Sequence, residues 1–388
     1  MTTTLIIGAG NIGSTTIKDL NITGALLKMQ TGIIPRPIPE EDQLRRLEWL
    51  KNGFIDLAYE GSALPACLEA REPAEAGRYR GQFQMRIVAS AHSGAFGYIV
   101  RGDSRIRTIR DITKETRLAV LSRAGMIHGL LAWLKLYEGN LEKPETIKWK
   151  ARLVPFETYQ ANIRSVAEGT ADVSFANPEG DITASVAAAP HCLRFLEIPA
   201  DKDPEGYARY RRFMPYGQVA PAPKLGVREI WGVKTFIGTA NIWCRDDFNA
   251  SLAYRLTKWF DEAYEQYRDN GDKLANYSRQ AFRQALNVAM VPVHPGAVRY
   301  FREIGMWKPT DDRRQEYNNS VLNRYCQLWD GTLAEAANKN IPINLANRDW
   351  LALWAKNKAD AGVTSFKQMT DREITAGLAA LKQTAGRK

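Results

Sequence analysis

Apolar and polar positions along the chain follow a pattern that predicts strands and helices in turn. An apolar run at residues 5–9 predicts a buried strand, and a helix-like stretch follows it. The leucines of a later helix fall on one stripe that ends at Gly53, a natural residue for a helix end, and residues 54–63 then predict a strand leading into a loop. This pattern is typical of an α/β fold.

The unit of helix, glycine, aspartate and strand occurs a second time further along the chain. Residues 161–180 contain a helix, Gly169, Asp172, a strand and a polar loop, in the same order as residues 50–61. Two copies of one unit predict two similar α/β lobes rather than one large sheet.

Long strand-like runs are placed where a chain could pass between two lobes. Residues 83–90 and 96–104 form one such pair around a turn-rich stretch, and residues 229–247 form a return strand. We therefore predict a two-lobed α/β fold with crossing hinge strands and a helical C-terminal extension. The predicted division is lobe 1 at residues 1–98 and 230–307, lobe 2 at residues 99–229, and the extension at residues 308–388.

Composition narrows the class of protein. The chain has 388 residues, of which 45% are hydrophobic and 25% charged, so it can form two cores and is not a disordered chain. It contains no apolar run long enough to span a membrane. The net charge of +10 is spread along the sequence without a basic block or a nucleic-acid module, so we expect no nucleic-acid partner. No export signal precedes the first strand, which leaves either a cytoplasmic protein or a signal that has been removed.

The residue types of metal and catalytic sites lack the spacing that those sites need. The four cysteines and four histidines are Cys67, Cys192, Cys244, Cys326, His92, His128, His191 and His294. They form no C-x-x-C pair and no H-x-x-x-H pair, which disfavours a metal site or a redox pair. No nucleophile elbow or Ser–His–Asp pattern occurs either. We expect no catalytic residues, no metal and no cofactor.

Gly8, Gly10 and Gly13 have the spacing of a dinucleotide-binding fingerprint. That fingerprint also requires an acidic residue at the end of the second strand, and residues 28–37 contain none. Prolines from Pro35 onward further disfavour a central strand there. A Rossmann-type NAD(P)-dependent oxidoreductase is therefore the less favoured alternative. What remains is a turn whose helix could hold an anion at its free N–H groups.

Five segments together resemble the TAXI-type solute receptors of tripartite ATP-independent periplasmic (TRAP) transporters. They occur in the order found in that family, within residues 4–306, and the last is the most specific. The segments are residues 7–13, 47–59, 105–125, 166–177 and 291–305.

This resemblance implies a type II periplasmic-binding-protein fold, no catalytic residues and a small organic anion as ligand, often a dicarboxylate or an amino acid such as glutamate. It also implies delivery to the membrane permease of a TRAP transporter. Residues 13–17 depart from the aromatic run that is usual in the family. The helical residues 308–388, in which Thr370 and Glu373 form a capping box, extend beyond a typical member.

The candidate ligand-binding residues follow predicted strands or open predicted helices. They are Asn11, Ser14, Thr15, Tyr59, Ser62, Ser122, Arg123, Gly125, Asn177 and Trp231. Arg123 is the foremost candidate because its guanidinium can hold a carboxylate with two hydrogen bonds. Tyr59 could equally belong to the core, Trp231 has a large apolar surface that is more often found in a core, and Arg123 could be a surface residue.

The sequence thus predicts a periplasmic solute-binding protein that captures a small organic anion, a carboxylate or an amino-acid-like molecule. It would act as a monomer, without inserting into the membrane, and would pass its ligand to TRAP permease subunits. A cytoplasmic ligand-sensing module on the same fold is the main alternative.

Overall fold

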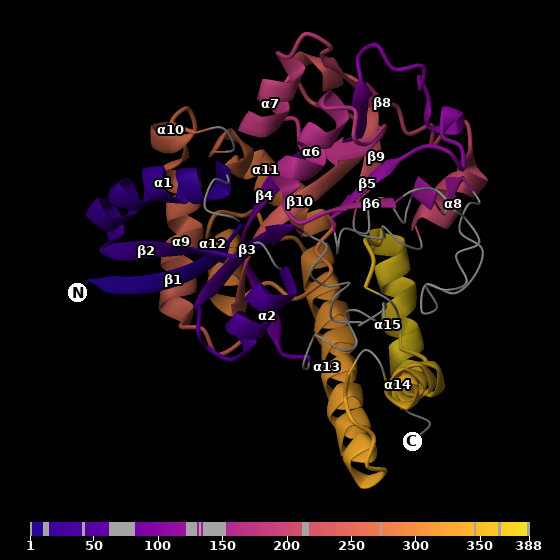
Figure 1. Cartoon of the computed structure of the whole chain (residues 1–388). Coiled ribbons are helices and arrows are strands. Elements are labelled where there is room, and N and C mark those ends of the chain that lie inside the picture. Colours follow the sequence, from indigo (N-terminus) through magenta and orange to yellow (C-terminus); the bar gives the residue numbers. More distant parts are fainter. Residues whose placement is uncertain are drawn as a thin grey trace. The chain divides into compact units, whose positions relative to one another are not determined.

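The computed structural model describes most of the chain. The described residues are 2–10, 15–40, 43–61, 82–121, 130–131, 133–134, 153–211, 217–271, 274–344, 347–363 and 366–385. They form two compact α/β units, Met1–His92 with Thr239–Lys388 as unit 1 and Ser93–Gly238 as unit 2. Two strands, β4 (Met85–Arg101) and β10 (Lys234–Arg245), each contribute residues to both units (Figure 1). The predicted fold class, two α/β units with crossing strands and a helical extension, is confirmed.

The sheet of unit 1 is built around β1 (Thr3–Ala9). Strand β2 (Ile33–Pro39) and strand β3 (Leu57–Gly61) both pair with β1 in parallel, and β10 pairs antiparallel with β3. The order β2-β1-β3 places β2 at the sheet edge, where the missing N–H groups of its prolines are tolerated. A Rossmann sheet would have β2 between β1 and β3, so the order differs from that of a dinucleotide-binding fold.

Helix α1 (Thr15–Thr31) connects β1 to β2, and helix α2 (Gln43–Lys51) precedes β3. Helix α2 forms because Leu47 and Leu50, both fully buried, lie on one face. Gly53 then adopts a left-handed backbone with φ of 76°, which confirms its predicted role just past the helix end.

Unit 1 is completed by helices from the second half of the chain. They are α9 (Ala250–Glu262), α10 (Tyr264–Tyr267), the 3-10 helix η4 (Leu274–Tyr277), α11 (Arg279–Asn287) and α12 (Pro295–Glu303). The H-P-G motif begins α12: the His294 ring accepts a hydrogen bond from the N–H of Gly296, and Pro295 occupies the first helical turn. A Cβ on Gly296 would lie 2.2 Å from the carbonyl oxygen of Ala250, so glycine permits the close packing of α12 on α9.

The C-terminal extension is part of unit 1 and consists of α13 (Pro309–Asn338), α14 (Arg348–Ala361) and α15 (Asp371–Ala385) (Figure 1). Trp329 on α13 packs edge-to-face on Trp350 and Trp354 of α14, and all three belong to the core cluster that includes β1. The capping box of Thr370 and Glu373 is confirmed, since the side chain of each accepts from the backbone N–H of the other.

Unit 2 repeats the arrangement of unit 1 around β5 (Leu118–Leu121). Strand β6 (Leu153–Phe156) pairs with β5 in parallel, and β7 (Ser174–Ala176) follows helix α6 (Tyr159–Ala167) and Gly169. The remaining elements are α7 (Asp181–Ala187), β8 (Leu193–Leu196), α8 (Pro204–Arg211), β9 (Gln218–Pro221) and the 3-10 helices η1 (Ile109–Asp111) and η3 (Arg228–Ile230).

Candidate functional site

In unit 1, the carboxyl ends of β1, β2 and β3 meet at one edge of the sheet, the usual place for a ligand in an open α/β sheet. The N–H of Glu40 donates to the carbonyl oxygens of Ala9 and Gly10 at 2.9 and 3.1 Å, which holds the ends of β2 and β1 together. Glu40 therefore follows β2 directly. Its carboxylate pairs with Arg45 at 3.1 Å.

The first glycine of the fingerprint serves packing. A Cβ on Gly8 would lie 2.7 Å from Cδ1 of Ile55, in the segment that leads into β3. Glycine at this position lets β1 and that segment approach closely. The spacing that suggested a nucleotide site is accounted for, at this position, by the interior of unit 1.

A buried ion pair stands at the same edge of the sheet. Arg46 of α2 directs its guanidinium to the carboxylate of Glu60 and to the carbonyl oxygen of Glu40. The Glu60 side chain is only 12% exposed, and its Oε1 accepts from the N–H of Gly61 at 2.9 Å. The structure largely buries Glu60 and neutralises its charge with Arg46.

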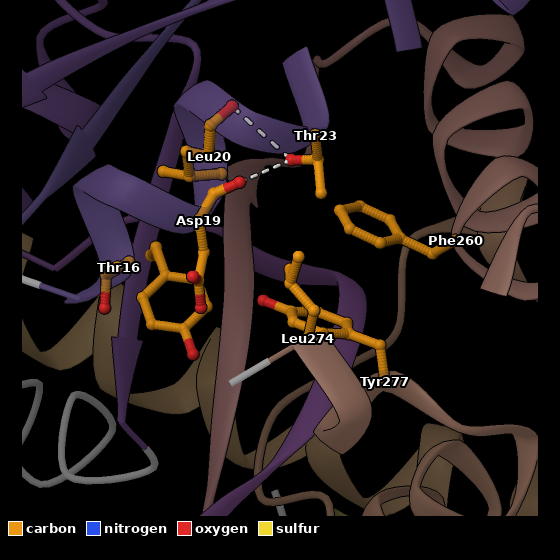
Figure 2. Close-up of a pocket in the computed structure, with 8 residues that line it drawn as sticks. Thr16, Asp19, Leu20, Thr23, Phe260, Leu274 and Tyr277 are labelled. Carbon is orange, nitrogen blue, oxygen red and sulfur yellow. Dashed lines mark hydrogen bonds between the residues drawn. The ribbon is translucent and has the colours of Figure 1, made fainter. Parts of the chain in front are cut away.

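A small pocket lies beside this edge, between the first turns of α1 and the end of β3 (Figure 2). Thr16, Asp19 and Thr23 enter it from α1, while Phe260 and Tyr277 approach from the other side. Tyr59, Leu20 and Leu274 complete the lining. The space open to the centre of a water molecule is about 10 Å³, enough for one water-sized group.

The pocket wall combines one carboxylate with aromatic rings and hydroxyl groups. Asp19 is 4% exposed. The ring of Tyr277 stacks on Phe260 at a centroid distance of 4.9 Å, and burial together with Tyr59 and Asp19 raises the pKa of Tyr277 well above its usual value. The hydroxyl of Thr23 donates to the carbonyl oxygen of Asp19 at 2.9 Å, which fixes this turn of α1 (Figure 2).

The structure brings two of the predicted neighbourhoods together in unit 1. Thr15 is the first residue of α1, its neighbour Thr16 lines the pocket, and Tyr59 lines it from the middle of β3. Six predicted site residues lie outside the described residues, namely Asn11, Ser14, Ser62, Ser122, Arg123 and Gly125.

Asn177, predicted from the end of β7, has hydrogen bonds within its own unit. Its Oδ1 accepts from the N–H of Glu179 at 2.8 Å, its N–H donates to the hydroxyl of Tyr159 at 2.6 Å, and its carbonyl oxygen accepts from Thr183 at 2.7 Å. These contacts make Asn177 the organiser of the loop before α7. Trp231 is 38% exposed, with the guanidinium of Arg228 5.8 Å from its ring centroid.

Arg46 and Asp19 are the residues that sequence reasoning missed. A signal for Arg46 exists, because it stands four residues before the buried Leu50 and so shares its helix face. Asp19 lies between the buried Ile17 and Leu20, which is an unusual place for an acid on a helix.

The described residues contain no group of three or more His, Cys, Asp or Glu side chains that could hold a metal ion. Cys192, Cys244 and Cys326 are free thiols, and burial raises the pKa of Cys326 to about 12. Within the same described part of the chain, no helix is long and apolar enough to cross a membrane.

Solved structures similar to this chain include binding proteins for small molecules. The probable amino-acid ABC transporter extracellular-binding protein of Bacillus subtilis is 10% identical with a TM-score of 0.41, over 70% of this chain and 98% of that chain. The binding protein component of an ABC phosphonate transporter from Pseudomonas aeruginosa is 13% identical with a TM-score of 0.42, over 93% and 99%. The periplasmic aliphatic sulphonate binding protein of Escherichia coli is 13% identical with a TM-score of 0.42, over 96% and 92%.

No curated protein matches the chain. A family match extends over residues 47–305, which include the second half of α2, the whole of unit 2 and the H-P-G helix α12. The chain therefore belongs to the NMT1-like family.

Proposed function

We propose that this protein is an extracytoplasmic solute-binding protein that captures a small organic anion, a carboxylate or an amino-acid-like molecule, in the manner of the TAXI-type receptors. The observation that carries the proposal is the meeting of α1 and β3 around the pocket of Thr16, Asp19 and Tyr59. Membership of the NMT1-like family and the two α/β units joined by crossing strands support it. The protein performs no chemistry on its ligand.

The anionic end of the ligand is assigned to the start of α1. The free N–H groups of a helix N-terminus attract negative charge, and the hydroxyls of Ser14 and Thr15 would add donors there. Arg46 neutralises the carboxylate of Glu60, so Glu60 does not oppose an anion at this edge of the sheet. Arg123, Asn11, Ser62, Ser122, Gly125, Asn177 and Trp231 remain proposed contacts.

Delivery to a TRAP membrane permease from the periplasm follows from the resemblance of the five segments to TAXI-type receptors. The cytoplasmic ligand sensor stays as a second candidate because three free thiols are unusual in an oxidising compartment. Fractionation of cells that express the native gene separates the two: a receptor is released with the periplasmic contents, and a sensor stays with the cytoplasm.

A thermal-unfolding screen of organic anions and amino acids tests the proposal. A ligand that binds only the folded state at about 100 times its Kd adds roughly 2.7 kcal/mol to the free energy of unfolding. We expect at least one compound of these classes to raise the melting temperature, and NAD or NADP to leave it unchanged. Stabilisation by the nucleotides alone would overturn the proposal in favour of the oxidoreductase.

A further inference from the structure

We propose that unit 1 has a second binding site, which takes a small oxyanion with several acceptor oxygens, such as phosphate or sulfate. The site is a hollow of about 530 Å³ where the end of α1 packs on α9, next to α10 (Figure 1). A volume of this size lies within the range of small-molecule sites in proteins. The polar part of its lining consists of Gln30, Thr31, Arg255, Lys258, Glu262 and Gln266.

The hollow is separate from the pocket assigned to the transported solute. Gln30 follows Thr16 by 14 residues in the same helix, which corresponds to roughly 21 Å along the helix axis. A small ligand at one end of α1 therefore does not occupy the place at the other end. The inference does not depend on the proposed function.

One side of the hollow presents hydrogen-bond donors. The indole N–H of Trp259 donates to Oε1 of Gln30 at 2.7 Å, and Nε2 of Gln30 donates to Oε1 of Gln266 at 2.8 Å. An indole N–H can only donate, so it fixes the orientation of both amides. Each amide oxygen already accepts a hydrogen bond, so the amide atom of Gln266 left without a partner among the described residues is its nitrogen, on an exposed side chain.

Two cations lie on the other side of the hollow. Arg255 donates to the carbonyl oxygen of Thr31, which holds the guanidinium in place and leaves its other N–H groups for a ligand. This bond also offsets the negative end of α1, which would otherwise disfavour an anion. Lys258 lies 3.4 Å from Glu262 and 3.8 Å from Glu303, and its side chain is 37% exposed. Exposed pairs of this kind contribute little to stability, so the ammonium group is able to turn toward a bound anion.

The set of donors selects the class of ligand. A phosphate or sulfate presents acceptor oxygens on every side, and a guanidinium can hold two of them at once. An ammonium ligand would instead meet Arg255 and Lys258, and it would have to compete with Lys258 for the carboxylate of Glu262. A neutral polyol brings hydroxyl donors of its own, and the amide oxygens of Gln30 and Gln266 are already engaged. The hollow therefore favours an oxyanion over both.

Calorimetric titration of the full chain with inorganic phosphate and with sulfate, at constant ionic strength, tests the site. The first variant is Gln266→Glu, whose carboxylate still accepts from Gln30 but replaces an outward N–H donor by a charged oxygen. The second is Arg255→Met, which removes the guanidinium. The control is Asn21→Asp, which adds the same charge as Gln266→Glu at an exposed position of α1 outside the hollow.

We expect at least one of the two oxyanions to bind the parent with a millimolar or lower Kd. Loss of a hydrogen bond to a charged group should weaken that binding by about tenfold or more in Gln266→Glu and in Arg255→Met. Asn21→Asp should stay within about twofold, because salt screens an exposed charge at a distance.

Three results would overturn the site: no binding of either oxyanion to the parent, unchanged binding in both hollow variants, or equal weakening in Asn21→Asp, which would reduce the effect to overall charge. Gln266→Glu alters an exposed side chain, so the test does not depend on the folding of Arg255→Met. None of these results changes the proposed function, because the screen of organic anions and amino acids tests that function independently.

Discussion

The helix–strand unit of α2 and β3 and that of α6 and β7 share one scaffold. Each ends its helix at a left-handed glycine, Gly53 or Gly169, and places an aspartate three residues later. Asp56 accepts the N–H of Ile6 at 2.7 Å and returns its own N–H to the carbonyl oxygen of Ile6 at 2.9 Å. Asp172 makes the same two bonds to Arg117, at 2.8 and 2.9 Å. The repeated motif is therefore a lock that ties the segment after the helix to β1 in unit 1 and to the residue just before β5 in unit 2.

The two copies differ in the buried helix residue that bonds to a residue of the following strand. Seven residues before the glycine, unit 1 has Arg46, paired with Glu60, and unit 2 has Asn162, whose Oδ1 accepts from Ser174 at 2.5 Å. Both helix residues are buried. One copy is held by charges and the other by neutral hydrogen bonds.

The copies also differ in what the strand and the loop after it contact. Tyr59 within β3 lines a pocket, whereas the loop that follows β7, from Asn177, is held by hydrogen bonds within its own unit. Gly226 packs there so tightly that a Cβ would lie 2.3 Å from the carbonyl oxygen of Pro178. Both units thus keep the two hydrogen bonds of the aspartate, while the residues of the strand and of the loop after it have different roles. The predictions below test this difference, from the largest expected effect to the smallest.

The largest effect is expected from removal of the extension, which unit 2 does not share. Gln315 of α13 accepts from the N–H of Val293 and donates to its carbonyl oxygen at 2.9 and 2.8 Å, and Asn318 donates to the carbonyl oxygens of Ala289 and Val291. A chain that ends at Trp307 loses these bonds and the tryptophan cluster of α13 and α14. We expect no cooperative thermal unfolding of unit 1 by circular dichroism. A truncated chain that melts at the parent's temperature would show that the extension is dispensable.

Arg46→Met should be the most costly single substitution of this comparison. It leaves Glu60 buried without its cation, and loss of one partner of a buried pair costs about 3–5 kcal/mol. Chemical denaturation measures the effect. Arg45→Met is the matched control, because Arg45 is 57% exposed on the same turn and its pair with Glu40 contributes about 0–1 kcal/mol. The double variant Arg46→Met with Glu60→Met should recover most of the loss; equal costs for the two single arginine variants would contradict a buried pair.

Asp56→Ala and Asp172→Ala test whether the two locks are equivalent. Each leaves one backbone N–H without its acceptor, at about 1–3 kcal/mol. Asp172 also holds the guanidinium of Arg117 at 2.6 Å, but that pair is about one-third exposed and adds little. We expect similar changes in the free energy of unfolding, measured by urea titration. A loss of stability in only one of the two variants would mean that the two units share the path of the backbone but not the energetic role of the aspartate.

Local rules predicted the scaffold, because the glycine ends of the helices, the aspartate and the capping box of Thr370 depend on neighbours in the sequence. The segment that contains the H-P-G motif was the most specific of the five in the sequence. The reason for its glycine is the close contact of Gly296 with Ala250, which is distant in the sequence. Asp19 and Arg46 were not predicted from the sequence, also because of contacts between distant residues. Their partners and surroundings, Glu60, Tyr59 and Tyr277, come from other elements, so only the fold reveals them.

The smallest expected effect is a dependence of stability on pH that arises from His294 in unit 1. His294 is buried; its Nδ1 accepts from Gly296 at 3.1 Å and its Nε2 lies 2.9 Å from the carbonyl oxygen of Phe248, so the neutral ring fits both bonds. Burial lowers the pKa of His294 below its usual value of 6.5. Below pH 6.5 the unfolded chain therefore binds a proton that the folded chain resists, and stability falls as pH decreases, by at most about 1.4 kcal/mol per pH unit until the folded pKa is reached. We expect His294→Asn, which keeps a capping side chain, to flatten the pH profile of urea unfolding between pH 7 and 5. A profile that stays the same in His294→Asn would assign the acid sensitivity to the carboxylates instead.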